Sequence, residues 1–258
     1  TMDFSNIYEA VNLLDLNLDS TGLRSIEGIG QARSLTTLSL SFNGIRGRLP
    51  SELFQLENLR YMAISNNVLT GLLPDVFGNL RYLRTLKLDR NLFVGPLPAF
   101  AESPSLSNLD LASNELSGSI PQTFLNGLAG QSPTVFIDLA QNRLEGTIPH
   151  SLGRFDRMTL NVTQNLITAI DPSLCAKNSW NEGNVQKYGC DAILCPRETA
   201  NGDGRRRDGQ TCRSCKENDS GYLGQTLCGG MPSESSIIRV GWTAALALSC
   251  TLILLATH

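Results

Sequence analysis

The stretch LTTLSLSFNGIRGRLPSELFQLEN, residues 35–58, decides the fold because nearly the same text begins again at residue 59. Its pattern, L-x-x-L-x-L-x-x-N-x-L-x-G-x-[LI]-P, recurs from Leu59, Leu83, Leu106 and Thr134, with a weaker copy over 13–23 and a degenerate one over 160–172. The pattern's asparagines follow one another at steps of 24, 24, 23, 28 and 23 residues. They are Asn43, Asn67, Asn91, Asn114, Asn142 and Asn165. This periodicity predicts about seven stacked repeats with atypical terminal copies.

Each part of the repeat has a physical task. The L-x-L leucines point inward from a short strand while alternate residues face outward, because strand side chains change sides at every residue. The inward asparagine is expected to bond backbone groups of the neighbouring turn, so that the asparagines form a structural ladder. Gly followed by [LI]-Pro suits a turn on the outer side of each coil. An array of amphipathic helices is the alternative, but a Gly and a Pro in every unit would cost such a helix roughly 1 and 3 kcal/mol.

The repeat resembles the plant-type leucine-rich repeat, whose unit carries the same N-x-L-x-G-x-I-P signature. The resemblance spans residues 13–172. It implies an α/β-type leucine-rich-repeat solenoid, right-handed, with a parallel β-sheet on the concave face and a mostly irregular or 3-10 convex side. Further on, YGCDAILCPRETANGDGRRRDGQTC resembles the Cys-rich region of leucine-rich-repeat surface proteins of diatoms and related algae. The chain departs from that region at Arg197 and Glu198, where those proteins usually carry Pro and Gly.

These features divide the chain into five parts. An N-terminal flank or cap covers 1–12, the solenoid 13–174, a Cys-rich region 175–230, a linker 231–240 and a hydrophobic tail 241–258. The six cysteines of the Cys-rich region could hold zinc through C-x4-C and C-x-x-C pairs, or form three disulfides. An extracellular setting favours disulfides and no metal. Nearest neighbours would pair Cys175 with Cys190, Cys195 with Cys212, and Cys215 with Cys228, one of fifteen possible connectivities.

The tail and two sequons indicate the secretory route and the cell surface. The segment 241–257 carries no charged residue, and only His258 follows it in the sequence. This pattern is typical of either a glycosylphosphatidylinositol-anchor signal or a short membrane-spanning helix. Asn161 and Asn218 lie in N-x-[ST] triplets and are candidate glycosylation sites. The first residues contain no signal peptide, so we expect an export signal upstream of Thr1.

Catalysis, cofactors and nucleic acid find little support in the sequence. A net charge of −3 gives no electrostatic reason for a nucleic-acid partner. His150 and His258 lack the neighbouring groups of a catalytic site, so we expect no enzyme activity and no cofactor. The segment NGDGRRRDG, residues 201–209, lacks the strand, Lys and Ser or Thr of a phosphate-binding loop, and we expect a solvated loop there.

Binding on the concave sheet is therefore the expected function. The outward register predicts these ligand-binding residues: Phe42, Tyr61, Arg84, Lys87, Arg90, Asp110 and Asp138. The chain is interpreted as a surface-attached recognition or adhesion protein for a protein or polysaccharide ligand. The alternatives are a soluble inhibitor of extracellular hydrolases, like the polygalacturonase-inhibiting proteins that share this type of repeat, and a truncated receptor ectodomain. The charged patch could also be ordinary solvated surface.

Overall fold

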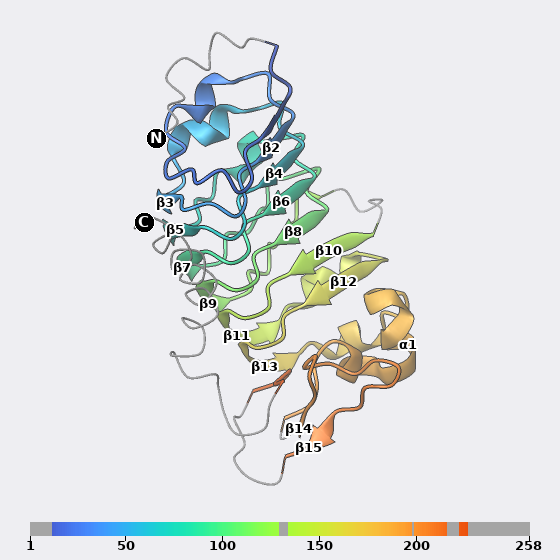
Figure 1. The fold of residues 1–258 in the computed structure, drawn as a ribbon. Coiled ribbons are helices and arrows are strands. Elements are labelled where there is room, and N and C mark those ends of the chain that lie inside the picture. Colours follow the sequence, from blue (N-terminus) through green and yellow to red (C-terminus); the bar gives the residue numbers. More distant parts are fainter. Residues whose placement is uncertain (1–11, 129–133, 198, 216–221, 227–258) are drawn as a thin grey trace, which may run out of the picture.

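The computed structural model describes residues 12–128, 134–197, 199–215 and 222–226 of the 258-residue chain. Short strands, one from each predicted repeat, pair in parallel to form the first sheet, in the order β1-β2-β4-β6-β8-β10-β12. They are β1 (Asp15–Asn17), β2 (Thr37–Ser39), β4 (Tyr61–Ala63), β6 (Thr85–Lys87), β8 (Asn108–Asp110), β10 (Val135–Asp138) and β12 (Met158–Asn161). Figure 1 shows this stack along the length of the molecule. The predicted solenoid with a parallel sheet is confirmed.

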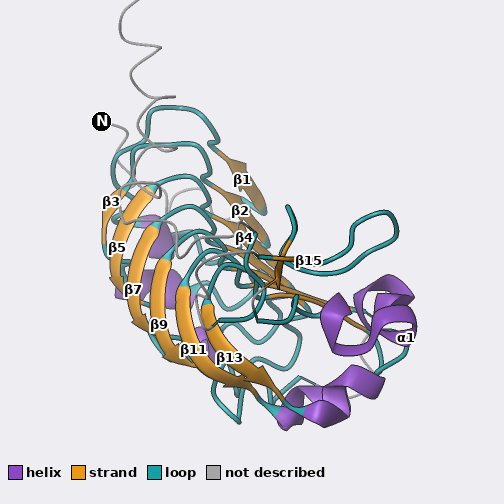
Figure 2. Cartoon of the chain, turned by 90° about the horizontal axis from the view of Figure 1, so that it is seen from below, coloured by secondary structure: helices purple, strands orange, loops and turns teal. Residues whose placement is uncertain are grey.

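A second parallel sheet forms where the sequence predicted only turns. Its strands follow the order β13-β11-β9-β7-β5-β3. They are β3 (Arg46–Gly47), β5 (Val68–Leu72), β7 (Leu92–Pro96), β9 (Glu115–Ser119), β11 (Arg143–Ile148) and β13 (Leu166–Ile170). Figure 2 views the coil from below and shows this sheet as a curved row of strands. The N-x-L-x-G-x segment of each repeat thus runs as a strand, because the same segment of the next repeat lies beside it and accepts its backbone hydrogen bonds.

Short 3-10 turns connect the second sheet back to the first, as expected for the convex side. They are η2 (Ile29–Gln31), η3 (Ser51–Gln55), η4 (Phe77–Asn79) and η5 (His150–Arg154). Four phenylalanines stack along this side, at or near these turns: the ring centroids of Phe54 and Phe77 lie 5.1 Å apart, those of Phe77 and Phe100 5.1 Å, and those of Phe100 and Phe124 6.1 Å. The leucines of all coils form one continuous buried core inside the two sheets. No coil could bury its apolar face alone.

The repeat asparagines link each coil to the one before it. Asn91 is typical: its Nδ2 donates to the carbonyl oxygens of Ile64 and Leu88 at 2.9 and 3.1 Å, and its Oδ1 accepts from the backbone N–H of Leu69 at 3.1 Å. The equivalent bonds recur at Asn43, Asn67, Asn114, Asn142 and Asn165. The amide is therefore fully used at each step, is buried at every position but Asn43, and fixes the spacing between coils.

The Cys-rich region folds against the last coil. The turn η6 (Pro172–Ala176) leads into it, and it contains η7 (Trp180–Gly183), α1 (Asn184–Tyr188), η8 (Gly189–Ala192), and a small antiparallel pair, β14 (Thr199–Ala200) with β15 (Arg213–Ser214). The predicted disulfides Cys175–Cys190 and Cys195–Cys212 are confirmed. Cys215 is also disulfide-bonded. Its predicted partner Cys228 lies outside the described residues.

The Cys-rich region also ends the first sheet by satisfying the free edge of β12. The backbone N–H of Leu160 donates to Asn181 Oδ1 at 2.9 Å, and its carbonyl oxygen accepts from Arg205 Nη1 at 3.1 Å. Further along, the N–H of Gln164 donates to the carbonyl oxygen of Gly224 at 3.2 Å. These groups replace the next coil, so the edge of the sheet offers fewer free donors and acceptors for pairing with another chain.

The predicted hydrophobic tail, 241–258, and the sequon at Asn218 lie outside the described residues. Across the part of the chain that the structure does describe, every helix is too short or too polar to cross a membrane.

Candidate ligand-binding face

The concave face is the outward surface of the first sheet. Tyr61 lies on β4, Lys87 ends β6, and Asp110 and Asp138 end β8 and β10. Arg84 immediately precedes β6, while Phe42 and Arg90 follow their strands by three residues. All seven residues that the sequence proposed as ligand-binding therefore belong to this one sheet or its margin. Their role as a binding site stays a prediction.

A row of polar residues crosses the middle of this face. The strand register places Lys87 beside Asp110, Asp110 beside Asp138, and Asp138 beside Asn161. At one end of the row, Asn161 Nδ2 donates to Asp138 Oδ2 at 2.9 Å. At the other end, Lys87 lies beside Asp110, so the row holds one cation and two neighbouring carboxylates. We call Lys87, Asp110, Asp138 and Asn161 the central row.

The electrostatics of the central row are unbalanced at Asp110. Partial burial, together with the nearby carboxylates of Asp89 and Asp138, raises the pKa of Asp110 to about 6. The backbone N–H of Ala112 and the Lys87 ammonium act in the opposite direction but do not cancel this rise. Asp110 is thus held in a site that disfavours its charged form. A cation placed against it would be stabilised by the neighbouring carboxylates.

Asp89 lies next to the central row and is 7% exposed. Its carboxylate accepts from the Ser65 hydroxyl and forms an ion pair with the Arg90 guanidinium at 3.0 Å. Arg90 is therefore already engaged in this structure, although its side chain is 64% exposed. The basic group predicted at Arg84, Lys87 and Arg90 is consequently interleaved with carboxylates.

Phe42 stands out at the N-terminal end of the face. Its φ angle is 57°, in the left-handed region that Asn and Gly adopt far more readily than Phe, and its side chain is 62% exposed. The equivalent position in the next repeat is Asn66, at φ 55°. The same position is left-handed in the other repeats too, at Ser20, Asn66, Arg90, Ser113, Gln141 and Gln164, so this backbone belongs to the repeat, and the exposed aromatic ring is what is particular to Phe42.

A polar groove lies at the C-terminal end of the face, where the Cys-rich region meets the last two coils. It has a volume of about 220 Å³. Its lining comes from both parts of the chain: Ala140, Gln141, Asn161, Thr163, Gln164, Gly202, Asp203, Arg205, Arg207 and Thr226. We call it the C-terminal groove. The central row thus continues into it through Asn161.

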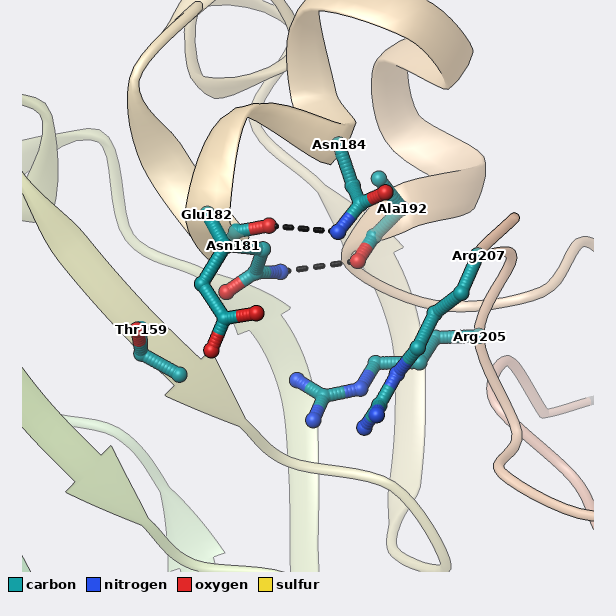
Figure 3. A pocket seen from close by; sticks show the side chains of 7 residues that line it. All are labelled: Thr159, Asn181, Glu182, Asn184, Ala192, Arg205 and Arg207. Atoms are coloured by element: carbon teal, nitrogen blue, oxygen red, sulfur yellow. Dashed lines mark hydrogen bonds between the residues drawn. The ribbon is translucent and has the colours of Figure 1, made fainter.

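Two guanidinium groups lie side by side at this groove. Figure 3 shows Arg205 and Arg207 extended together, facing the carboxylate of Glu182 across a smaller neighbouring pocket of about 40 Å³. Burial, followed by the like charge of Arg207, lowers the pKa of Arg205. Arg207 Nε lies 3.5 Å from Asp203 Oδ2. The groove therefore presents a pair of cations beside acidic groups.

The expectation of a solvated loop at 201–209 is wrong for its central part. Gly204 is buried, and Arg205 is half-buried because it closes the edge of β12. The sequence carried no signal for this placement, because the segment matches no binding motif and its partner strand lies about 45 residues away. Phe136, on β10 and 46% exposed, is another residue of the face that the sequence analysis did not single out. The strand register alone would have found it.

Asn161, the predicted glycosylation site, lies on the predicted binding face. Asn161 Nδ2, the atom that would carry a glycan, donates to Asp138, and Oδ1 accepts from the Thr163 hydroxyl at 2.9 Å. Glycosylation at Asn161 stays a prediction, and a glycan there would enter the C-terminal groove. Across the described residues, no group of three or more His, Cys, Asp or Glu side chains is arranged to hold a metal ion.

Two family models match the chain. One, described as leucine rich repeat, covers residues 33–93, and a second leucine-rich-repeat model covers residues 105–126. Among curated proteins, none matches at a significant level.

Solved plant structures share the fold. The peptide hormone receptor RGFR1 in complex with RGF2 is 30% identical with a TM-score of 0.61, and covers 67% of this chain and 28% of its own. The Arabidopsis receptor kinase HAESA, in complex with the peptide hormone IDA and the co-receptor SERK1, is 28% identical with a TM-score of 0.58, covering 67% of this chain and 29% of its own. A plant ice-binding protein is 27% identical with a TM-score of 0.54, covering 61% and 50%.

The chain therefore contains leucine-rich repeats and is structurally similar to plant leucine-rich-repeat receptor ectodomains. It spans half the length of the ice-binding protein and less than a third of the two receptor chains. The narrower resemblance to algal surface proteins with a Cys-rich region stays a prediction.

Proposed function

We propose that the chain is an extracellular binding protein, without catalytic activity, that recognises a peptide or an extended protein segment on the concave face. The observation that carries the proposal is the pair of adjacent carboxylates Asp110 and Asp138, with the pKa of Asp110 raised to about 6. Such a pair attracts a Lys or Arg side chain of a ligand, whose positive charge would add to that of Lys87. Because these carboxylates are negatively charged, they favour a basic peptide over an acidic polysaccharide.

The rest of the face fits an extended ligand that crosses the strands. Phe42, exposed at one end, offers an aromatic contact, and aromatic residues are enriched among those that dominate binding energies. Arg205 and Arg207 offer hydrogen-bond donors for an acidic group at the other end. Of the two similar receptors, RGFR1 is a peptide hormone receptor bound to RGF2, and HAESA is bound to the peptide hormone IDA. That likeness supports a peptide ligand here as well.

The proposed location is the outside of the cell. The disulfides Cys175–Cys190 and Cys195–Cys212 support an oxidising compartment. Attachment to the surface would come from the apolar segment 241–257, whose sequence fits a lipid-anchor signal or a short spanning helix. Treating intact cells that display the full chain with a phosphatidylinositol-specific phospholipase C separates these two: release indicates the lipid anchor, and retention indicates the helix.

Selection from a random peptide library against the full chain tests the proposed ligand class. We expect the selected peptides to be enriched in Lys or Arg. Asp110→Asn should weaken their binding at least tenfold, because a hydrogen bond to a charged group contributes about 1.5–3 kcal/mol. The matched control is Asp156→Asn, which removes the same charge from an exposed position between η5 and β12. Selected peptides without basic residues, or equal losses for the two variants, would refute the proposal.

Phe42→Asn provides a second test on the same peptides. The substitution should weaken binding while it raises the melting temperature, because Asn adopts the left-handed backbone more readily than Phe. If Phe42→Asn binds the selected peptides with unchanged affinity, Phe42 is not part of the binding site.

A further inference from the structure

An exposed aromatic ring stands beside the two carboxylates of the central row. Phe136 lies two residues before Asp138 on β10, so the two side chains face the same side of the first sheet. The register places Phe136 between Asn108 on β8 and Thr159 on β12, on three strands that Figure 1 shows side by side. Among the exposed large apolar side chains of the described residues, Phe136 is the one that belongs to a strand of this sheet. Its ring therefore offers an apolar contact next to the carboxylates.

A repeated turn fixes the orientation of both carboxylates. Asp110 Oδ1 accepts from the backbone N–H of Ala112 at 3.1 Å, and Asp138 Oδ1 accepts from the N–H of Ala140 at 3.0 Å. Both aspartates begin the same D-L-A sequence and lie directly beside each other in the register. The two carboxylates are therefore held in the same way on neighbouring strands about 4.8 Å apart. A ligand would not have to order them, which lowers the cost of binding.

The second oxygen atoms of the two carboxylates differ in their contacts. Asp138 Oδ2 accepts from Asn161 Nδ2 at 2.9 Å. Among the described residues, no hydrogen-bond donor lies within reach of Asp110 Oδ2. Lys87 stands on the side of Asp110 that faces away from β10, and its ammonium forms no ion pair with a carboxylate of the described residues. The side of the pair that faces Phe136 is thus open to a cation from a ligand.

An aromatic ring beside two carboxylates distinguishes arginine from lysine. A guanidinium is planar, carries five donors in a fixed fork and stacks on aromatic rings, whereas a lysine ammonium is a compact, strongly hydrated charge. A planar cation can lie against the Phe136 ring and still donate from its edge to both carboxylates. An ammonium can contact the carboxylates, but it gains less from the ring and loses more hydration. The combination therefore favours a guanidinium.

Resting on the basic-peptide function proposed above, we propose that Phe136, Asp110 and Asp138 form an arginine subsite for an extended peptide ligand. The guanidinium lies on the Phe136 ring and donates to Asp110 Oδ2 and to the Asp138 carboxylate. Phe136 is then the residue that determines the choice of arginine over lysine, while the two carboxylates supply affinity for either cation. Asn108 and Thr159, on the two sides of Phe136, are shorter side chains and leave the ring accessible.

Binding at this subsite should depend on pH through Asp110. Burial and the carboxylates of Asp89 and Asp138 raise the pKa of Asp110 to about 6, against the opposing charge of Lys87. A guanidinium favours the charged carboxylate, so protonated Asp110 should bind it poorly. The Kd of an arginine peptide should therefore rise about tenfold between pH 7 and pH 5, and Asp110→Asn should remove this dependence. A Kd of the natural chain that stays constant over this range would overturn the role of Asp110.

Three matched random peptide libraries test the subsite on the immobilised full chain. The peptides are about nine residues long, with Arg, Lys or Gln fixed at the centre and with Arg and Lys left out elsewhere. We expect the Arg library to be retained about fivefold more than the Lys library, and the Gln library least. Equal or greater retention of the Lys library, with both above the Gln library, would overturn the arginine subsite alone. Retention of neither library above the Gln library would overturn the proposed basic-peptide function as well.

Variants of Phe136 assign the preference to its ring. Individual peptides from the Arg library are compared with copies that carry Lys at the same position. Phe136→Leu should bring the affinity ratio of the two peptides from about five to about one, and Phe136→Tyr, which keeps the ring, should preserve the ratio. Tyr82→Leu removes an exposed aromatic ring beyond η4 and is the matched control, which should leave both affinities unchanged. Melting temperatures identify any variant that fails to fold, and Phe136→Thr then takes the place of Phe136→Leu. A ratio that stays the same without the ring would overturn the proposal.

Discussion

At the scale of single residues, the asparagines and aspartates of the repeats perform opposite tasks. Asn91 is 4% exposed and uses both its donor and acceptor atoms on the backbone of its own coil and the preceding one. Asp110 is instead partly exposed and lies among like charges. One side chain therefore stabilises the coil, while the other is held at a cost in stability that a bound cation would relieve.

Asn91→Ala should lower the free energy of unfolding by about 3 kcal/mol. The substitution leaves the buried N–H of Leu69 and the carbonyl oxygens of Ile64 and Leu88 without their partner, and each such loss costs about 1 kcal/mol or more. Chemical denaturation of the variant measures the change. Asn79→Ala, at an exposed position in η4, is the matched control and should change stability by less than about 0.5 kcal/mol.

Asp110→Asn should make the protein more stable at neutral pH. The folded pKa of about 6 lies above the ordinary Asp pKa of 3.8, so between these pH values the folded state binds more protons than the unfolded state. The free energy of unfolding of the natural chain therefore falls as pH rises through this window. The variant lacks that fall and should gain about 1–2 kcal/mol at pH 7, allowing for solvent screening of a partly exposed group, and little at pH 3.5.

Denaturation curves at several pH values measure this effect. Asp75→Asn removes one negative charge from an exposed position after β5 and controls for the change in net charge. A difference between Asp110→Asn and the natural chain that does not vary with pH would contradict the electrostatic account.

At the scale of elements, the glycines of the repeat differ in what they contribute. Gly71 has φ 86°, and a Cβ there would stand 2.9 Å from Arg48 Cγ. Gly44, in the same repeat as Arg48, has no such constraint, since its nearest neighbour is a carbonyl oxygen at 3.8 Å and its φ lies outside the left-handed region. Position 71 therefore requires glycine because its φ is positive, whereas position 44 can accept another residue.

Gly71→Ala should consequently cost about 1–2 kcal/mol of unfolding free energy, because Ala pays the strain of a positive φ and crowds Arg48. Gly44→Ala should be neutral or stabilise by a few tenths of a kcal/mol, because it restricts the unfolded chain. Thermal unfolding of the two single variants compares them. Similar losses at both positions would show that the position of glycine in the repeat is not what matters.

At the scale of the whole molecule, the Cys-rich region holds the open end of the solenoid. The disulfide Cys195–Cys212 closes the loop that carries Arg205, and Arg205 bonds the carbonyl oxygen of Leu160 on the edge strand. The same loop forms one wall of the C-terminal groove. The end of the solenoid and the end of the proposed ligand site therefore depend on one cross-link.

Replacing both Cys195 and Cys212 by Ala should lower the free energy of unfolding by about 3 kcal/mol, as estimated for a loop of some 15 residues. The freed edge of β12 should also make the variant aggregate on heating, which light scattering measures. Arg205→Met is the matched comparison: it removes the edge contact but keeps the cross-link, so it should raise aggregation with a smaller loss of stability. Unchanged aggregation in both variants would contradict the capping role.

The amino-acid sequence by itself determined the repeat, the inward leucines, the asparagine positions and the outward register of the first sheet. Each of these is a local periodic property, in which a residue's neighbours lie at fixed separations along the chain. Closeness in sequence also predicted the pairs Cys175–Cys190 and Cys195–Cys212, as one of fifteen possible connectivities, and the structure confirmed them. Because the outward register of the first sheet is periodic, the sequence alone assigned Asp110 and Asp138 to one face.

Tertiary structure alone decided the rest. The second sheet exists because segments that lack alternating apolar residues pair with copies of themselves about 24 residues away, and Leu72 and Val94 meet only through that pairing. The pKa of Asp110 is raised by burial and by the charge of Asp89, and Asp89 lies in a different coil from Asp110. Arg205 reaches Leu160 across 45 positions through a disulfide-closed loop with no repeat. Contacts between non-repeating segments leave no period in the sequence, so only folding reveals them.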